Sequence, residues 1–230
     1  MHTRTYLRRR GRLTRGQARA WQQHHDQLVL EEPDEPVDWS TWFGRDASLG
    51  VEIGFGMGDA LLSWAQQDAD WNLLGIDVYQ PGIGALLLGV ERAGLDNVRV
   101  LAADARQAMA RCFAPDSVGE IRIFFPDPWP KKRHHKRRLI QPEFVAVLAR
   151  CLRPGARLLL ATDWQDYAQS MHSVMEQADG FTCAYPGMEF APRPVARPLT
   201  RFEARGLRLG HEVWDLAYIK TAAVEAKPSA

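Results

Sequence analysis

Short apolar runs alternate with helical patterns along most of the chain, and this alternation constrains the fold more than any other feature. The strand-like runs cover residues 49–53, 72–78, 98–102, 121–125 and 157–162. The helical patterns cover residues 59–67, 81–93, 105–113, 142–152 and 164–178. Strands that alternate with helices form mostly parallel sheets. The chain is therefore expected to be an α/β protein, and 230 residues with 46% hydrophobic content suffice for a single domain.

The two ends of the chain depart from this alternation. Seven Arg and no acid lie between Met1 and Ala20, and the first forty residues are polar. We expect residues 1–40 to form a basic, flexible arm and residues 41–230 to form the folded domain. Near the C-terminus, residues 181–184 and 212–220 are two more strand-like runs, with a helix near residues 202–209 between them. This late pair predicts an antiparallel strand at one edge of the sheet.

A glycine-rich turn follows the first strand and opens a helix, as nucleotide-binding turns do. It contains Glu52, Gly54, Gly56 and Gly58, and its glycines allow the backbone to approach a ligand. A nicotinamide fingerprint has a third glycine where this chain has Asp59. A carboxylate at a helix N-terminus repels a pyrophosphate that would bind there. S-adenosylmethionine has no phosphate and carries a positively charged sulfonium and an ammonium, so nearby carboxylates attract it. The turn therefore indicates S-adenosylmethionine as the cofactor.

Two further acids end the second and third strands. Asp77 lies about twenty residues beyond the glycine turn, where an acid accepts hydrogen bonds from ribose hydroxyls. Asp104 ends the third strand and is placed for the adenine amino group. Acids after strands also cap helices, so for Asp104, which precedes Ala105, the capping role stays open.

A strand at residues 121–125 leads into Asp127, which stands between Pro126 and Pro128. Pro128 disfavours the helical region for Asp127 and holds this acid extended. Six Lys or Arg and two His follow at residues 131–138, so a local basic patch exists although the formal net charge is only +1. We interpret this segment as a reactive carboxylate beside a polyanion site. The alternative is a proline-stiffened loop followed by a solvated basic face.

Several classes of protein are disfavoured by composition. Cys112, Cys151 and Cys183 are odd in number and lack a Cys-x-x-Cys pair, which argues against a disulfide framework or a zinc site and favours a reducing compartment. The seven His form no metal-binding motif, so no metal is expected. No apolar stretch approaches the about 20 residues of a membrane span.

Five motifs together closely resemble those of bacterial tRNA (guanine-N7)-methyltransferases. They are VEIGFGMG (51–58), GIDVYQPGIGALL (75–87), FFPDPWPKKRHHKRR (124–138), ATDW (161–164) and TRFEARGLRLGHEVWDL (200–216). The resemblance runs from residues 11–17 nearly to Lys220. It implies a single-domain class I, Rossmann-like fold dependent on S-adenosylmethionine, with tRNA as partner, a cytoplasmic location and no obligate protein partner.

Carried over residue by residue, the resemblance implies that Glu52, Asp77, Asp104 and Asp127 contact the methyl donor. It implies that Asp127 is the catalytic acid. Contacts with the target nucleotide are implied for Lys131, Asp163, Thr200, Arg201, Phe202 and Glu203. This chain has Asp77 where the family more often has Glu, and Tyr79 where it often has His.

Some roles remain open at this stage. Thr200-x-x-Glu203 is also a capping box, so both residues are candidates for a purely structural role at a helix start. Trp129 is a candidate for packing or for stacking on a base. Trp164 and Trp214 are expected in the core.

The chemistry expected of this chain is methyl transfer to an atom that carries no proton. Guanine N7 has an in-plane lone pair, so positioning supplies most of the acceleration. Asp127 is expected to accept hydrogen bonds from the guanine N1–H and amino group and to favour the cationic product ring. The basic run and the N-terminal arginines are expected to hold the tRNA backbone. The alternatives are a methyltransferase for another base or amino group, a nicotinamide reductase and a non-catalytic RNA-binding subunit.

Overall fold

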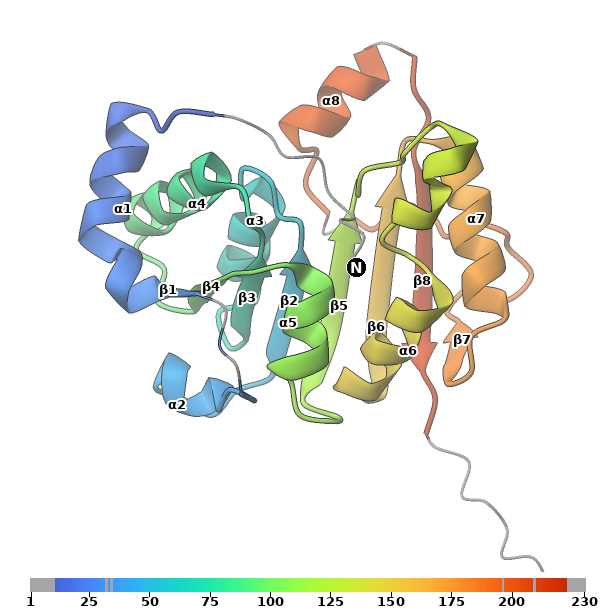
Figure 1. Cartoon of the computed structure of the whole chain (residues 1–230), viewed down its shortest axis with the longest axis horizontal. Coiled ribbons are helices and arrows are strands. Elements are labelled where there is room, and N and C mark those ends of the chain that lie inside the picture. Colours follow the sequence, from blue (N-terminus) through green and yellow to red (C-terminus); the bar gives the residue numbers. More distant parts are fainter. Residues whose placement is uncertain (1–10, 32, 34, 196, 209, 223–230) are drawn as a thin grey trace, which may run out of the picture.

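The structure of the chain, a computed structural model, describes residues 11–222 except residues 32, 34, 196 and 209. Eight strands of this described part form one sheet in the order β1-β4-β3-β2-β5-β6-β8-β7 (Figure 1). They are β1 (Val29–Glu31), β2 (Leu49–Ile53), β3 (Asn72–Ile76), β4 (Val98–Ala102), β5 (Val118–Phe124), β6 (Leu152–Thr162), β7 (Phe181–Cys183) and β8 (Trp214–Lys220). Strands β1 to β6 pair in parallel, and β8 runs antiparallel to both β6 and β7. The predicted α/β fold with a mostly parallel sheet and a late antiparallel strand is confirmed.

Helices cover both faces of the sheet. The helices are α1 (Arg15–Leu28), α2 (Trp39–Phe43), α3 (Asp59–Gln67), α4 (Gln80–Ala93), α5 (Ala105–Arg111), α6 (Pro142–Cys151), α7 (Gln165–Glu176) and α8 (Arg201–Arg208), with a 3-10 helix η1 (Lys132–Arg137). One buried cluster joins α1, α3 and α4 to the sheet, and a second joins α2, α5, α6 and α7 to it. No helix among the described residues is long and apolar enough to cross a membrane.

Local sequence explains where the helices begin and end. Pro81 lies in the first turn of α4, where its missing N–H has no helical acceptor, and Gly94 ends the helix with a φ of +63°. On the inner face of α3, Leu61 is fully buried and Trp64 is 2% exposed. Burying one such side chain contributes about 1.5–3 kcal/mol, so the amphipathic pattern is sufficient to dock these helices.

Most predicted elements are present with small differences in their bounds. Strands β2 and β4 and helix α3 have the predicted bounds, whereas β5 begins at Val118 and β6 at Leu152, earlier than expected. The early parts of both strands contain residues that an apolar pattern does not mark, such as Gly119 in β5 and Pro154 in β6. Element type was therefore easier to predict than element length.

The N-terminal segment differs from the expected arm wherever the structure describes it. Thr14 caps α1 in a capping box with Gln17. Helix α1 packs closely against α4. A Cβ added to Gly84 of α4 would lie only 2.8 Å from the side chain of Leu13 and 3.1 Å from that of Gln17. Strand β1 then pairs in parallel with β4. The arginines obscured this signal, because they lie in the same segment as the capping box. Residues 1–10, which carry four of the arginines, lie outside the described residues.

Candidate active site

Acids follow the carboxyl ends of five neighbouring parallel strands, β4, β3, β2, β5 and β6. Asp104 follows β4, Asp77 follows β3, Asp59 opens α3 after β2, Asp127 follows β5 and Asp163 follows β6. From β2 the chain continues to β3 on one side of the sheet and later returns to β5 on the other side, so the carboxyl ends of β2 and β5 form a topological switch point. Doubly wound sheets bind ligands at such points. The sheet order thus brings the predicted strand-end acids to one edge.

The glycine turn after β2 has a backbone that favours glycine. Gly54, Gly56 and Gly58 have φ values of +73°, +59° and +86°. A Cβ on Gly54 or Gly56 would meet nothing within 4 Å, so the backbone there faces open space that a ligand can approach. In contrast, a Cβ on Gly82 would lie 2.0 Å from the carbonyl oxygen of Gly56. The start of α4 therefore packs directly on the glycine turn.

Asp77 holds the glycine turn and the start of α4 in place. Its Oδ2 accepts a hydrogen bond from the backbone N–H of Gly56 at 3.1 Å. Its Oδ1 accepts from the N–H groups of Val78 at 2.7 Å and Tyr79 at 3.0 Å. The carboxylate that was predicted to bind ribose thus also fixes the backbone around the proposed ligand.

Asp104 is the N-cap of α5, as the capping alternative predicted. Its Oδ1 accepts hydrogen bonds from the N–H groups of Arg106 at 3.0 Å and Gln107 at 3.3 Å. Both bonds use the same oxygen, so capping is compatible with a ligand contact through Oδ2.

Glu52 is a carboxylic acid buried inside the sheet beside the glycine turn. It is 3% exposed, and among the described residues its Oε2 has no hydrogen-bond partner. Burial raises the pKa of Glu52 to about 8, an effect that Arg122 opposes and Asp77 reinforces. Buried polar atoms are almost always hydrogen-bonded, so an orphaned carboxyl oxygen at a ligand-binding edge indicates a functional group. Its environment suits a positively charged ligand.

The loop that carries Asp127 is tightly constrained. Phe125 and Trp129 have φ values of +53° and +45°, a region that non-glycine residues rarely adopt. The N–H of Phe125 donates to Ala161 O at 2.8 Å, and Arg138 Nε donates to Pro128 O at 2.9 Å. Such backbone strain persists only where the surroundings impose it, and it clusters at functional sites.

The basic run divides into an exposed face and an inner face. Arg138 is 1% exposed, lies 4.8 Å above the ring of Tyr167 and is hydrogen-bonded to Asp166. The expectation that Arg138 holds tRNA is therefore wrong, because its guanidinium is used to fix the Asp127 loop. Arg137 lies 4.9 Å above the ring of Trp129. The exposed cations of the run are Lys131, Lys132, Arg133 and Lys136.

His134 in the run adds little positive charge at neutral pH. Desolvation, together with the neighbouring cations Arg137 and Arg133, lowers the pKa of His134. The basic character of this surface therefore comes from its lysines and arginines.

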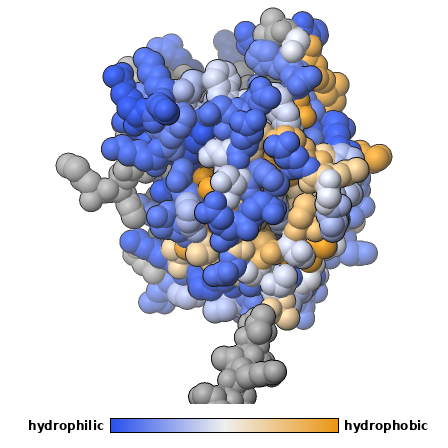
Figure 2. Space-filling model, turned by 90° about the vertical axis from the view of Figure 1, so that its right-hand side faces the viewer, coloured by the Kyte–Doolittle hydropathy of each residue, from blue (hydrophilic) through white to orange (hydrophobic). Residues whose placement is uncertain are grey.

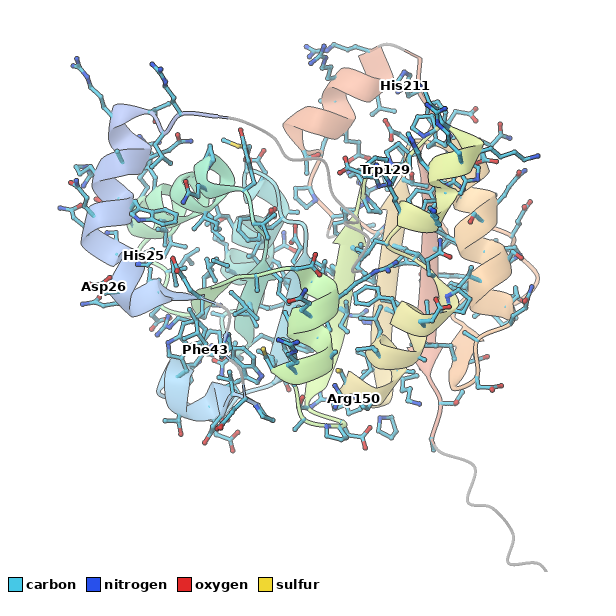
Figure 3. The ribbon with its side chains drawn as sticks, viewed as in Figure 1. His25, Asp26, Phe43, Trp129, Arg150 and His211 are labelled. Atoms are coloured by element: carbon cyan, nitrogen blue, oxygen red, sulfur yellow. The ribbon has the colours of Figure 1, made fainter. Side chains whose placement is uncertain are left out.

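Asp163 is paired with a residue that the sequence did not single out. His211 Nδ1 lies 3.3 Å from Asp163 Oδ2, and Gly206 of α8 lies against both side chains. His211 and Trp129 lie at the same end of the molecule, above the ends of β5 and β6 (Figure 3). The only sequence signal for His211 was its place inside the last motif.

Thr200 and Glu203 form half of the expected capping box. The N–H of Glu203 donates to Thr200 Oγ1 at 3.2 Å. The carboxylate of Glu203 is 2% exposed and accepts from Arg193 Nε at 3.1 Å and from Arg197 Nη1 at 2.8 Å. Glu203 is therefore buried in an ionic cluster. Arg201 and Phe202 begin α8, and their side chains lie outside the part of the chain that is described.

The tryptophans differ partly from expectation. Trp129 is 8% exposed and packs edge-on against His134 with ring centroids 5.8 Å apart, so it takes the packing role. Trp164 was expected in the core but is 40% exposed, because it stands just before α7 at the carboxyl edge of the sheet. Trp214 is partly buried.

One hollow lies away from this edge of the sheet. It has a volume of about 340 Å³ and lies between α7, β7 and β8. Figure 2 views the molecule from that side, and much of the surface seen there is hydrophilic. Within the described residues, no group of three or more His, Cys, Asp or Glu side chains is placed to hold a metal ion.

Comparison with protein families agrees with this geometry. Residues 46–216 match the family described as "Putative methyltransferase". The tRNA (guanine-N(7)-)-methyltransferase of Pseudomonas entomophila (strain L48) is 45% identical over 216 residues, which cover 94% of this chain and 90% of the relative. The protein of the same name from Paraburkholderia xenovorans (strain LB400) is 46% identical over 220 residues, which cover 96% and 84%.

Solved structures share the fold at much lower identity. The 16S rRNA methyltransferase KamB superposes with a TM-score of 0.61 at 18% identity, over 85% of this chain and 99% of that one. A variant of the 16S rRNA (adenine(1408)-N(1))-methyltransferase from Catenulisporales acidiphilia, solved with its cosubstrate SAM, gives a TM-score of 0.58 at 15% identity, over 85% and 96%. At this identity, the similarity concerns the fold alone.

Proposed function

The chain belongs to the tRNA (guanine-N7)-methyltransferase family, and we propose that it transfers a methyl group from S-adenosylmethionine to N7 of a guanine in the variable loop of tRNA. One observation carries this proposal beyond family membership. The glycine turn after β2 and the strained loop after β5 follow neighbouring strands at the same edge of the sheet, and exposed cations follow the second loop directly. The residues that we assign to the donor, to the catalytic carboxylate and to RNA binding therefore lie at one edge of the sheet.

The residues around the glycine turn fit a cationic donor without phosphates. S-adenosylmethionine supplies an electrophilic methyl group on its sulfonium when bound. We assign Glu52, whose Oε2 has no partner within the described residues, to the positively charged part of the donor. We assign Asp77 and Asp104 to its ribose and adenine, with the backbone of Gly54, Gly56 and Gly58 lying against it. Asp59 in the first turn of α3 would repel a pyrophosphate, which disfavours a dinucleotide.

Asp127 orients the acceptor and removes no proton in the proposed mechanism. Guanine N7 carries a lone pair and no hydrogen, so the attack needs no base. Asp127 accepts hydrogen bonds from the guanine N1–H and amino group, a pattern that adenine does not offer. Its charge also favours the cationic ring that forms as the methyl group is transferred. The unusual backbone at Phe125 and Trp129 supports this role, because a rigid loop holds the carboxylate in one position.

Binding of tRNA is assigned to the exposed part of the basic run. Lys131, Lys132, Arg133 and Lys136 are exposed directly after the Asp127 loop. Phosphate contacts of this kind position an RNA without reading its bases. We further propose that Lys131 and Asp163 contact the target nucleotide, and that Thr200, Arg201 and Phe202 do so from the start of α8.

We also propose that the enzyme acts in the cytoplasm as a chain that needs no second protein. The thiols Cys112 and Cys151 are buried, Cys183 is half-buried, and none of the three is in a disulfide, which is typical of a reducing compartment.

The test is incubation with methyl-labelled S-adenosylmethionine and a tRNA transcript, followed by nucleoside analysis. We expect 7-methylguanosine as the labelled product. A transcript with adenine in place of the variable-loop guanine is expected to remain unlabelled. A transcript with 7-deazaguanine at that position is expected to bind without being methylated, because a C–H replaces the attacking lone pair.

The matched protein variant is Asp127→Asn. It is expected to lose most of its turnover while still binding the donor. The pH dependence of the wild-type rate is expected to show no limb that reports deprotonation of the base. Label in another nucleoside, or transfer to the 7-deazaguanine transcript, would contradict the proposed reaction. Full activity of Asp127→Asn would contradict only the role of Asp127 and would leave the proposed reaction standing.

A further inference from the structure

A buried ionic cluster lies beside the strained loop after β5. Arg197 is 2% exposed and donates from Nη1 to Glu203 Oε2 at 2.8 Å and from Nη2 to Asp215 Oδ2 at 2.9 Å. Arg193 donates to the other oxygen of Glu203, from Nε to Oε1 at 3.1 Å. Burial raises the pKa of Asp215, and Arg197 opposes this shift. The buried guanidinium of Arg197 and the partly exposed guanidinium of Arg193 thus balance the buried carboxylates of Glu203 and Asp215.

Arg197 connects three segments that carry proposed site residues. Glu203 belongs to α8, which begins just after Thr200. Asp215 belongs to β8 and is paired with Ala161 of β6, two residues before Asp163. The guanidinium of Arg197 also lies 5.6 Å from the ring centroid of Phe124 and 5.5 Å from that of Phe125, at the start of the Asp127 loop.

A cluster of this kind is better suited to fixing geometry than to stabilising the fold. Buried ion pairs lose solvation that is often as large as their attraction, so replacing them with apolar residues is frequently neutral. The arrangement does, however, permit only one placement of its partners, because a guanidinium donates in a rigid planar fork. Here the guanidinium of Arg197 donates both to Glu203 of α8, the helix that begins with proposed substrate residues, and to Asp215 of β8, the strand that neighbours β6 near Asp163.

We propose that Arg197 is a positioning residue that aligns the start of α8 with the Asp127 loop, and that Glu203 is its anchor and does not read the guanine. This role differs from the substrate contact that the family resemblance implies for Glu203. Three hydrogen bonds from Arg193 and Arg197 occupy a carboxylate that has about four acceptor positions. The role rests on the proposed function, since it concerns alignment for that methyl transfer.

The first test compares Arg197→Lys with Arg193→Lys, because Arg193 bonds to the same carboxylate but is 41% exposed. Arg197→Lys is expected to lower kcat by about 10- to 100-fold, while the KM for tRNA and the calorimetric affinity for S-adenosylmethionine stay within about threefold of wild type. Arg193→Lys is expected to change kcat by less than about threefold, as is usual for an exposed partner. An unchanged kcat in Arg197→Lys, or a parallel loss of donor affinity, would overturn the positioning role.

The second test asks whether Glu203 contacts the base. Inosine lacks the guanine amino group, so a tRNA with inosine at the target position removes any contact with that group. If Glu203 is an anchor, wild type and Glu203→Gln have the same ratio of guanine to inosine kcat/KM, within about twofold. If Glu203 reads the amino group, the ratio falls by about tenfold in the variant. This ratio is independent of how active the variant is.

The outcomes also separate this role from the proposed function. Wild-type protein that forms no 7-methylguanosine would refute the proposed function. Normal wild-type activity with an unaffected Arg197→Lys variant would refute only the positioning role. If Arg197→Lys does not fold, Asp215→Asn breaks the same cluster from β8 with a side chain of the same shape. Failure of both variants to fold would make the cluster an element of stability and contradict the proposal.

Discussion

The Oδ2 atom of Asp77 accepts a hydrogen bond from the backbone N–H of Gly56 at 3.1 Å, so the end of β3 fixes the glycine turn that follows β2. The same carboxylate binds the N–H groups of Val78 and Tyr79 through its other oxygen. One side chain therefore sets the positions of both backbone segments that border the proposed donor site. We therefore expect the geometry of the proposed donor site to depend on Asp77 even before a ligand binds.

Replacing Asp77 with Ala is expected to weaken binding of S-adenosylmethionine at least about tenfold. Hydrogen bonds to a charged group contribute about 1.5–3 kcal/mol each, and the glycine turn also loses its support. Isothermal calorimetry measures the affinity, and circular dichroism checks the fold. Asp70→Ala, which removes an exposed acid near β3, is the control and should bind normally. Unchanged donor affinity in Asp77→Ala would exclude Asp77 from the site.

Two glycines near the donor site are expected to respond differently to a methyl group. In Gly54→Ala the new Cβ has no neighbour within 4 Å, so only the φ of +73° is unfavourable, at about 1–2 kcal/mol. In Gly82→Ala the Cβ would lie 2.0 Å from Gly56 O, and the backbone has to shift. We expect Gly82→Ala to lower the melting temperature of the ligand-free protein further than Gly54→Ala. Equal effects in thermal unfolding would contradict the close packing of α4 on the turn.

The strand ends could be predicted because parallel sheets place them together. Asp77, Asp104 and Asp127 each follow a short apolar run, and the order of a doubly wound sheet brings such positions to one edge whatever the details of packing. The glycine turn could be predicted as well, because a positive φ at three positions favours glycine at each of them.

Burial within a charged segment could not be predicted in the same way. Arg138 follows five exposed or half-buried cations, and nothing in the sequence distinguishes it from them; the turn of η1 points it at Pro128 and Tyr167. Likewise, Arg197 and Glu203 look like surface residues, and only the chain path of α8 and β8 buries them together. These positions depend on contacts between distant segments, which local patterns do not encode.

The stability of the ligand-free protein is expected to depend on the ionisation of Glu52. Its folded-state pKa of about 8 lies above its ordinary value of 4.5, mainly because of burial. Between these values the folded protein binds a proton that the unfolded chain has lost. The contribution to stability is therefore fully present below about pH 4.5 and is lost as the pH rises through about 8. The difference in melting temperature between wild type and Glu52→Gln should shrink or change sign over this range, and a constant difference would contradict the burial effect.

Donor binding is expected to show the opposite trend with pH. The ionised form of Glu52 attracts the positively charged donor, so affinity should rise as the pH approaches about 8 and binding should release a proton. Calorimetry in buffers of different ionisation enthalpy measures that proton directly. Glu52→Gln should bind more weakly near pH 8, without the release attributed to Glu52. Equal proton release in both proteins would assign the titration to another group.

Exposed and buried cations of the basic run are expected to affect different measurements. The double variant Lys132→Ala, Arg133→Ala should weaken tRNA binding and reduce the slope of log affinity against log salt by about 0.7–0.9 for each phosphate that the variant no longer neutralises. Its melting temperature and donor affinity should not change, because both side chains are exposed. Arg138→Ala should instead destabilise the protein by about 2 kcal/mol or more, since it removes charged hydrogen bonds to Pro128 and Asp166. Filter binding at several salt concentrations and thermal unfolding separate the two effects. If the double variant kept the wild-type salt slope, this face of η1 would be solvated without contacting RNA, and the proposed tRNA surface would have to lie elsewhere.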